Sequence, residues 1–255
     1  MTLRPATIYA DAWAGWRRDW PVLTAIAGMF VFLPQLALLL LVPDLPDMST
    51  VTGTDPNDPT MQAYMTALQA WVGHYGLIYL CVVLAAMYGQ FAIVAVYLAP
   101  GRPTVGSALG TALRLLPRLV LASIVWMLPL GLAGMILIRL PFLIFPIFAL
   151  ILARTLLVGP AILAARPIGA VAAIGRSFVL TRGHMLLLAS VVLSVVLAQY
   201  LAALPFVAVD QWMAKHAPNP IARAIVDTFA AGTAALGATA MALVQVAAWR
   251  RLSPR

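Results

Sequence analysis

The sequence predicts an all-α, polytopic membrane protein with six transmembrane helices arranged as three hairpins. The first observation is compositional: 63% of the 255 residues are hydrophobic and only 9% are charged, whereas soluble domains average about 45–50% and about 25%. The second is that the apolar residues gather in six runs, each long enough to cross a hydrocarbon core of roughly 30 Å. We therefore expect one integral membrane domain over residues 1–255.

The expected spans follow directly from these apolar runs. They lie at about 21–42, 76–99, 117–139, 141–164, 184–206 and 223–249. The residues before the first run are too polar and aromatic for a signal peptide, so the first span is expected to be retained. An even number of spans puts both chain ends on the same side of the membrane.

The distribution of positive charge predicts which side that is. Twelve of the sixteen Lys and Arg residues fall in the N-terminus, the 100–118 loop, the 165–184 loop and the C-terminus. Short loops rich in Arg stay in the cytoplasm, so both termini are expected there. The 15 Arg against the single Lys215 are typical of a GC-rich bacterial genome. The expected location is therefore a bacterial cytoplasmic (inner) membrane.

A cytoplasmic amphipathic helix, lying in the membrane plane, is expected before each outgoing span. Apolar residues recur at helical spacing in 6–20, 104–116 and 167–182, and basic residues point away from them. Each segment ends at a helix breaker: Pro21, Pro117 or Gly183. The chain is thus expected to repeat one hairpin unit over about 6–99, 103–164 and 167–249.

The external loop, 43–75, is the only long connection. Asp58 and Pro59 read as an N-cap and first helical residue, and an apolar stripe from Met61 to Val72 predicts an external helix. Asn219 and Pro220 repeat the signal before the last span. Small residues on every face of that span predict a close-packed central helix or a dimer contact.

Arg154 is the most informative polar residue, because a guanidinium inside a span costs about 2.5 kcal/mol or more. It either has a structural role, in which it contacts lipid phosphates or caps carbonyls of a neighbouring helix, or it serves transport or binds a substrate. Gln90, Gln199 and Gln245 lie in the second, fifth and sixth spans. Together they either line a polar cavity or serve as packing contacts between helices.

The basic inner face is the other candidate site. Its members are Arg114, Arg118, Arg176 and Arg182, with Ser177 among them. Each cation near an anionic leaflet contributes on the order of 1 kcal/mol to lipid binding. The expected partners are anionic membrane lipids on the cytoplasmic side, together with a protein partner or a second copy of the chain; nucleic acid is not expected.

Catalytic and metal-binding patterns are not found in the sequence. The chain has no Glu, and its one cysteine, Cys81, lies in an apolar run. His74 and His216 are expected outside and His184 inside, so the histidines cannot form one three-ligand site. The Gly-x-Ser-x-Gly nucleophile pattern and the phosphate-binding loop are absent. No catalytic residue, metal or cofactor is expected, and the chain is not expected to be an enzyme.

Two stretches resemble a known family. They are residues 154–160, RTLLVGP, and residues 169–184, GAVAAIGRSFVLTRGH. This arrangement is similar to that of polytopic proteins related to the glycerophosphodiester phosphodiesterase membrane domain and of the YciC-like family. Many relatives carry a Glu where this chain has Ala164 and Ala165. The resemblance implies an all-helical inner-membrane protein without catalytic activity.

Two functions fit the sequence. The first is a non-catalytic inner-membrane protein that interacts with lipid or organises an envelope assembly. The second is a small-solute transporter or channel, with Arg154 and the intramembrane glutamines lining its path. A transporter needs a water-accessible polar cavity, whereas the first function predicts dry packing and openings that face lipid.

Overall fold

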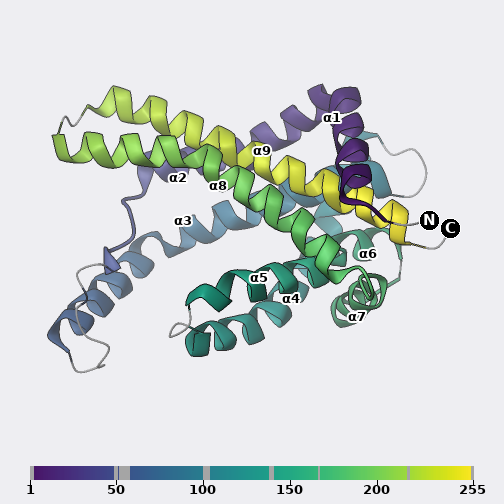
Figure 1. Ribbon diagram of the computed structural model, residues 1–255. Helices are drawn as coiled ribbons and strands as arrows, with labels where there is room; N and C mark the ends of the chain where they lie inside the picture. Colours follow the sequence, from purple (N-terminus) through teal and green to yellow (C-terminus); the bar gives the residue numbers. More distant parts are fainter. Residues whose placement is uncertain are drawn as a thin grey trace.

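The structure, a computed structural model, describes residues 3–48, 51, 58–99, 104–137, 141–165, 167–216 and 219–253. Within these residues every regular element is a helix. Six helices are long and apolar enough to cross a membrane, so the predicted number of spans is confirmed and the chain has the character of a multi-pass membrane protein. Figure 1 shows both chain ends at one end of the bundle.

The first span consists of three helical pieces without an intervening loop. Helix α1 (Pro5–Ala27) bends at Asp19, whose φ of −117° and ψ of 16° are not helical. Pro21 explains the bend, because its ring collides with the carbonyl four residues earlier. The π-helix η1 (Gly28–Phe32) and α2 (Leu33–Leu41) follow. The segment expected at 6–20 is thus the part of α1 before a bend, at a steep angle to the rest (Figure 1).

Helix α3 (Pro59–Leu98) is one continuous helix of 40 residues. The expected N-cap is confirmed, because the Asp58 side chain accepts a hydrogen bond of 2.7 Å from the Thr60 N–H. Hydrogen bonds from the side chain and the backbone N–H of Thr60 hold the pKa of the Asp58 carboxyl below its usual range. The expectation of a separate external helix is wrong, since its apolar stripe continues into the second span without a breaker.

Two contacts fix α3 against the first span. The Trp71 indole N–H donates to the Pro43 carbonyl at 2.9 Å, which ties the N-terminal half of α3 to the segment after α2. Further along, Gly89 lets η1 come very close: a Cβ there would lie 2.8 Å from Cβ of Phe30. The approach of the two helices therefore requires a residue without a side chain.

The expected break at Pro117 is wrong. Helix α4 (Val105–Leu137) runs through this residue, so 104–116 does not form a separate in-plane helix. Proline removes one backbone hydrogen bond, but helices in membranes tolerate this when neighbouring helices support them. Here α4 packs against α3, α5, α6 and α7.

The fourth span is interrupted and is followed by a short helix. Helix α5 (Pro141–Thr155) ends before Leu156, and α6 (Val158–Ala164) begins after Leu157, whose φ of −95° and ψ of 7° are not helical. Helix α7 (Ala170–Leu180) then stands alone, as expected for 167–182. The C-cap is Thr181, and Gly183 follows two residues later with a φ of +84°, so the predicted end of the helix before Gly183 is confirmed. Helix α8 (Met185–His216) follows directly.

Helix α9 (Pro220–Leu252) is the central helix, as one of the two sequence expectations had it. It packs against six other elements: α1, η1, α2, α3, α6 and α8. The Asn219 side chain accepts hydrogen bonds from the N–H groups of Ile221 and Ala222, which confirms the predicted start. Its small residues, such as Ala231 and Gly237, are buried and allow the neighbours to approach closely.

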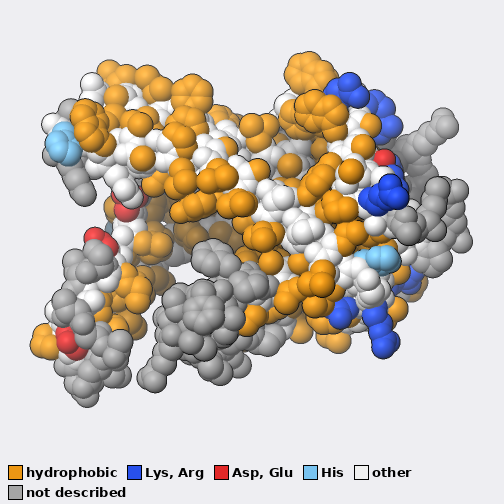
Figure 2. Space-filling view, viewed as in Figure 1, with side chains coloured by type: hydrophobic (Ala, Val, Ile, Leu, Met, Phe, Trp, Pro, Cys, Tyr) orange, Lys and Arg blue, Asp and Glu red, His pale blue; other side chains and the backbone are white. Residues whose placement is uncertain are grey.

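The outer surface of the bundle is apolar. Large side chains such as Leu77, Val179 and Leu186 are more than 70% exposed, and orange side chains cover most of the face in Figure 2. Such a surface is unfavourable in water and favourable against lipid. On the same face, Lys and Arg side chains gather beside the chain termini. We call this the arginine-rich end; it includes Arg18, Arg154, Arg176 and Arg250.

Candidate functional site

The interruption between α5 and α6 is held by one side chain of α7. The Ser177 hydroxyl, which is fully buried, donates to the Arg154 carbonyl at 2.5 Å and accepts from the Leu157 N–H at 3.3 Å. These are backbone groups that a continuous helix would have paired internally. Pro160, in the first turn of α6, has no N–H to continue the ladder. Ser177 thus replaces the lost hydrogen bonds.

The Arg154 guanidinium caps the C-terminus of α7. Its Nη1 donates to the Phe178 carbonyl at 2.9 Å, and its carbon Cζ lies 5.5 Å from the centroid of the Phe178 ring. Nε lies 3.2 Å from Sδ of Met185. A cation is favourable at a helix C-terminus, where carbonyls lack partners. The contact is the carbonyl-capping arrangement expected as one role of Arg154.

Arg154 and Ser177 therefore form a pair of reciprocal caps. The Arg154 guanidinium donates to the Phe178 carbonyl at the end of α7. In return, the Ser177 hydroxyl of α7 donates to the Arg154 carbonyl and accepts from the Leu157 N–H, the backbone groups left open between α5 and α6. The sequence singled out both residues but gave no reason to connect them. The connection depends on α7 folding back against α6, which no local pattern encodes.

The other predicted arginines lie on the surface of this end. Arg118 donates to the Ile168 carbonyl at 3.2 Å and so joins α4 to the segment before α7. Cζ of Arg176 lies 5.9 Å from the Trp249 ring centroid, a cation–π distance. Arg114 and Arg182 are exposed. The four arginines thus lie on the first half of α4, on α7 and just after α7.

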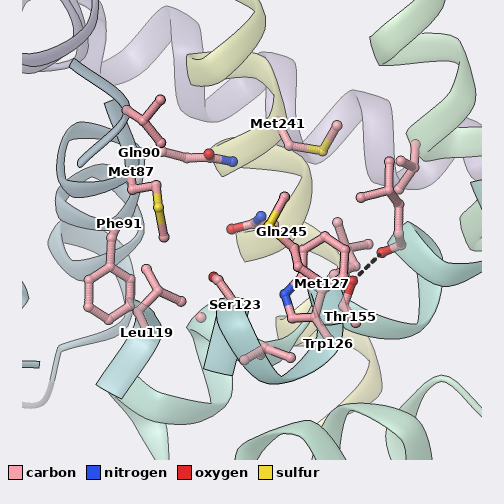
Figure 3. A pocket seen from close by; sticks show the side chains of 16 residues that line it. Met87, Gln90, Phe91, Leu119, Ser123, Trp126, Met127, Thr155, Met241 and Gln245 are labelled. Atoms are coloured by element: carbon pink, nitrogen blue, oxygen red, sulfur yellow. Dashed lines mark hydrogen bonds between the residues drawn. The ribbon is translucent and has the colours of Figure 1, made fainter. Parts of the chain in front are cut away.

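A cavity of about 420 Å³ lies between α3, α4, α5, α6, α8 and α9. Sixteen described residues line it and none of them is charged; four polar side chains, Gln90, Ser123, Thr155 and Gln245, stand among mainly apolar ones. Figure 3 shows Gln90 and Gln245 on one side and Ser123 and Trp126 on the other. Arg154 does not line this cavity, although its neighbour Thr155 does.

The mouth of the cavity is apolar. Val83 of α3 and Met127 of α4 line it, and they are 38% and 56% exposed. The cavity therefore opens between α3 and α4 through side chains that are themselves on the outer surface. In a bilayer, such an opening faces lipid chains.

The third glutamine lies elsewhere. The Gln199 side chain lies directly against Gly237 of α9. A Cβ built on Gly237 would lie 2.0 Å from Oε1 of Gln199. It lines a separate groove of about 500 Å³ with Tyr9 and Ser194, whose hydroxyl groups are hydrogen-bonded to each other. Gln90 and Gln245 therefore share one cavity, whereas Gln199 does not line it. Gln199 serves the α8–α9 contact.

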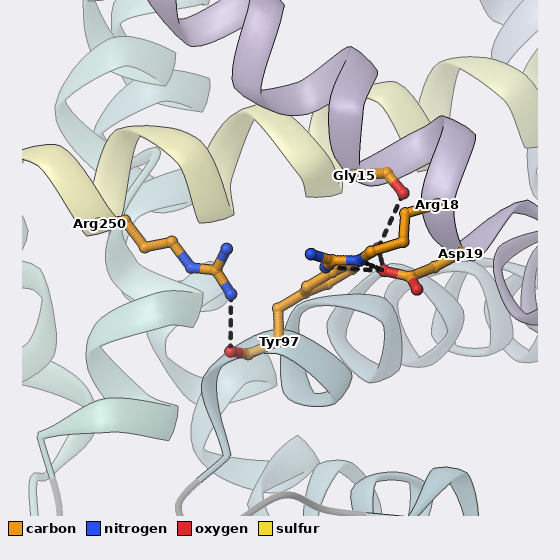
Figure 4. Close-up of polar contacts among 5 residues, drawn as sticks. All are labelled: Gly15, Arg18, Asp19, Tyr97 and Arg250. Carbon is orange, nitrogen blue, oxygen red and sulfur yellow. Dashed lines mark hydrogen bonds and ion pairs between the residues drawn. The ribbon is translucent and has the colours of Figure 1, made fainter.

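Sequence reasoning missed a polar cluster at the bend of α1. The Tyr97 hydroxyl donates to Oδ2 of Asp19 at 2.7 Å, and Arg18 forms an ion pair of 2.9 Å with the same oxygen. Arg250 donates to the Tyr97 carbonyl at 3.3 Å. Figure 4 shows the two guanidiniums approaching the Tyr97 ring from opposite sides. Asp19 beside Arg18, just before Pro21, was the one available signal.

The described residues offer no group of three His, Cys or Asp side chains that could hold a metal ion. Comparison with known protein families, with curated proteins and with solved structures finds no match for this chain. The resemblance to the membrane-domain family therefore stays a prediction. What the chain does must be argued from its own geometry.

Proposed function

We propose that the chain is a non-catalytic integral membrane protein that binds lipid, with an acyl chain entering the cavity between α3 and α4. The observation that carries the proposal is the chemistry of that cavity. Its wall is mainly apolar, its mouth consists of the exposed side chains of Val83 and Met127, and no described lining residue is charged. An acyl chain that fills such a space gains dispersion contacts with the wall that an empty cavity lacks.

The arginine-rich end supplies the headgroup part of the proposal. Arg114, Arg118, Arg176 and Arg182 are exposed around the ends of α4 and α7. Each contributes on the order of 1 kcal/mol to the attraction of an anionic lipid surface. Anionic phospholipids are therefore the preferred ligands in this proposal.

The proposal includes the finer topology. Six spans form three hairpins with both termini in the cytoplasm of a bacterial inner membrane, because the cationic loops stay inside. The part of α1 before its bend, and α7, lie in the membrane plane. The resemblance to the membrane-domain and YciC-like families belongs to the same proposal, as does the ability to hold a protein partner or a second copy through the exposed apolar faces.

A small-solute transporter is the second candidate, and one observation favours it. Gln90 and Gln245 of two different helices line the same cavity together with Ser123 and Thr155, so a polar solute would find hydrogen-bond partners there. In this form Arg154 is not part of the path, because its guanidinium is turned to α7. The two candidates differ in what fills the cavity, lipid chain or water.

Trp126 provides the test, because its side chain lines the cavity. The protein is reconstituted with phospholipids brominated on the acyl chain, which quench tryptophan fluorescence on contact, and separately exposed to acrylamide, a quencher dissolved in water. The fluorescence of Trp126 is obtained as the difference between the emission of the wild type and that of the Trp126→Phe variant. We expect strong quenching by brominated lipid and little by acrylamide. The opposite result supports a water-filled path and rejects the lipid proposal.

Filling the cavity gives an independent measurement. Ser123→Phe places a ring in the cavity, and Ser190→Phe places the same ring on the exposed face of α8. Native mass spectrometry with phosphatidylglycerol should detect fewer bound lipids for Ser123→Phe than for the wild type. The Ser190→Phe control should bind as the wild type does; equal binding by both variants would contradict the proposal.

A further inference from the structure

Charged side chains from three separate segments meet at the end of the bundle opposite the termini. They are Asp44 after α2, Asp210 of α8, and Arg223 and Asp227 of α9, and we call this cluster the acidic end. Arg223 lies 3.2 Å from Asp210 through Nε and 3.4 Å from Asp44 through Nη2. Asp227 lies close enough to Asp44, Asp210 and Arg223 to interact electrostatically with each of them. Among the described side chains, with every group ionised, three carboxylates face one guanidinium, and their net charge is −2.

Asp227 is the residue that the cluster leaves unsatisfied. It is only 5% exposed, and its Oδ2 is buried without a hydrogen-bond partner. Oδ1 of Asp210 is likewise buried, and its ion pair with Arg223 lacks the alignment of a hydrogen bond. A buried charged oxygen without a donor costs several kcal/mol. Within the described residues, Oδ2 of Asp227 therefore lacks the donor that its burial calls for.

A cavity of about 290 Å³ adjoins Asp227. Arg223 and Asp227 of α9 form its polar side, and Leu39, Leu41 and Val42 at the end of α2 lie on its apolar side. The space is thus shaped for a small group that carries a positive charge next to an apolar part. It shares no lining residue with the cavity of the proposed function, and the start of α9 lies at the end of the bundle opposite the termini (Figure 1).

We infer that the acidic end binds a primary ammonium group, with Asp227 as its main acceptor. A primary ammonium donates three hydrogen bonds and restores the charge balance that Arg223 achieves only in part. A trimethylammonium group carries the same charge but has no N–H and leaves Oδ2 of Asp227 without a donor. A directly ligated metal ion is disfavoured, because the described acidic side chains do not gather into a metal-binding group.

Two sources supply a primary ammonium: the headgroup of phosphatidylethanolamine and a free amine. The full chain in detergent is titrated with phosphatidylethanolamine or with phosphatidylcholine of the same acyl composition, and bound lipid is counted by native mass spectrometry. We expect preferential binding of phosphatidylethanolamine. Ethanolamine is then added as a competitor: displacement means that the ammonium alone is recognised, and persistence means that the lipid form is, and both support the inference.

Asp227→Asn is the decisive variant, because it keeps the size of the side chain and removes its charge. We expect binding of phosphatidylethanolamine to weaken about tenfold, which corresponds to the loss of about 1.4 kcal/mol, while phosphatidylcholine binding stays unchanged. The matched control is Asp58→Asn, which removes the carboxylate at the start of α3 and keeps a residue able to cap that helix. It should bind as the wild type does.

Two results would overturn the inference. One is equal binding of the two lipids by the wild type, and the other is unchanged preference in Asp227→Asn. Neither result depends on the cavity between α3 and α4, because the Trp126 experiment reads that cavity separately. The two proposals can therefore fail independently.

Discussion

The arginine-rich end and the acidic end both gather charges from distant parts of the chain, but they satisfy them differently. At the arginine-rich end, Arg154 caps a helix, Asp19 accepts from Arg18 and Tyr97, and Asp11 pairs with Arg251 at 2.7 Å. At the acidic end, one guanidinium is shared by two carboxylates, and Asp227 retains a buried oxygen without a donor.

This difference separates groups that hold the fold from groups that are available to a ligand. A hydrogen-bonded polar group contributes to stability, and its removal leaves its former partner buried without a hydrogen bond. An unsatisfied buried carboxylate lowers stability, so its removal should have the opposite effect. Removing a paired group at the arginine-rich end should therefore lower the free energy of unfolding, whereas removing the charge of Asp227 should not.

The largest loss is expected for Ser177→Ala at the arginine-rich end. The change leaves the Arg154 carbonyl and the buried Leu157 N–H without their partner. An orphaned buried group costs about 1–3 kcal/mol, so the free energy of unfolding should fall by about 2–4 kcal/mol. Denaturant unfolding in mixed micelles measures it. Ser190→Ala, at an exposed serine, is the control and should change little; equal effects would contradict the capping role of Ser177.

A smaller loss is expected for Tyr97→Phe. The variant removes the hydroxyl that donates to Asp19 at 2.7 Å and keeps the ring, whose centroid lies 5.9 Å from Cζ of Arg18 and 5.6 Å from Cζ of Arg250. Because Asp19 is partly exposed and also paired with Arg18, water and Arg18 replace part of the interaction, and we expect a loss of about 1 kcal/mol. The same unfolding assay checks this, and a loss as large as that of Ser177→Ala would mean that the bend depends on this hydroxyl.

No loss is expected for Asp227→Asn at the acidic end. Removing a buried charge without a hydrogen-bond partner relieves a desolvation cost, so the free energy of unfolding should stay the same or rise in detergent without phosphatidylethanolamine. A clear loss of stability would show that Asp227 is a structural residue. In that case the contrast between the two ends would not hold.

The helix starts and the number of spans could be predicted because they depend on local chemistry. Asp58 with Pro59, and Asn219 with Pro220, cap their helices as the sequence indicated. Gly183 adopts the backbone conformation that favours glycine. The expected break at Pro117 failed because proline is only a local obstacle, and the packing of α4 against several helices overrides it.

The contacts of the candidate sites could not be predicted, because they join residues far apart in the chain. Ser177 and Leu157 are 20 residues apart, Tyr97 and Asp19 are 78, and Arg223 and Asp44 are 179. Periodicity indicates which face of a helix is apolar but not which helix it meets. No local pattern distinguishes Asp227 from the other acidic residues, and only the folded chain separates it from them, by burying it.

The length of α3 has a mechanical consequence. A helix of 40 residues is about 60 Å long, twice the roughly 30 Å of hydrocarbon, so a large part of it extends beyond the bilayer as a rigid lever. Trp71 ties that lever to Pro43, and Gly89 holds its other half against Phe30 with no room to slide. A force applied to the part of α3 outside the membrane would therefore be transmitted along one unbroken helix to the wall of the cavity between α3 and α4.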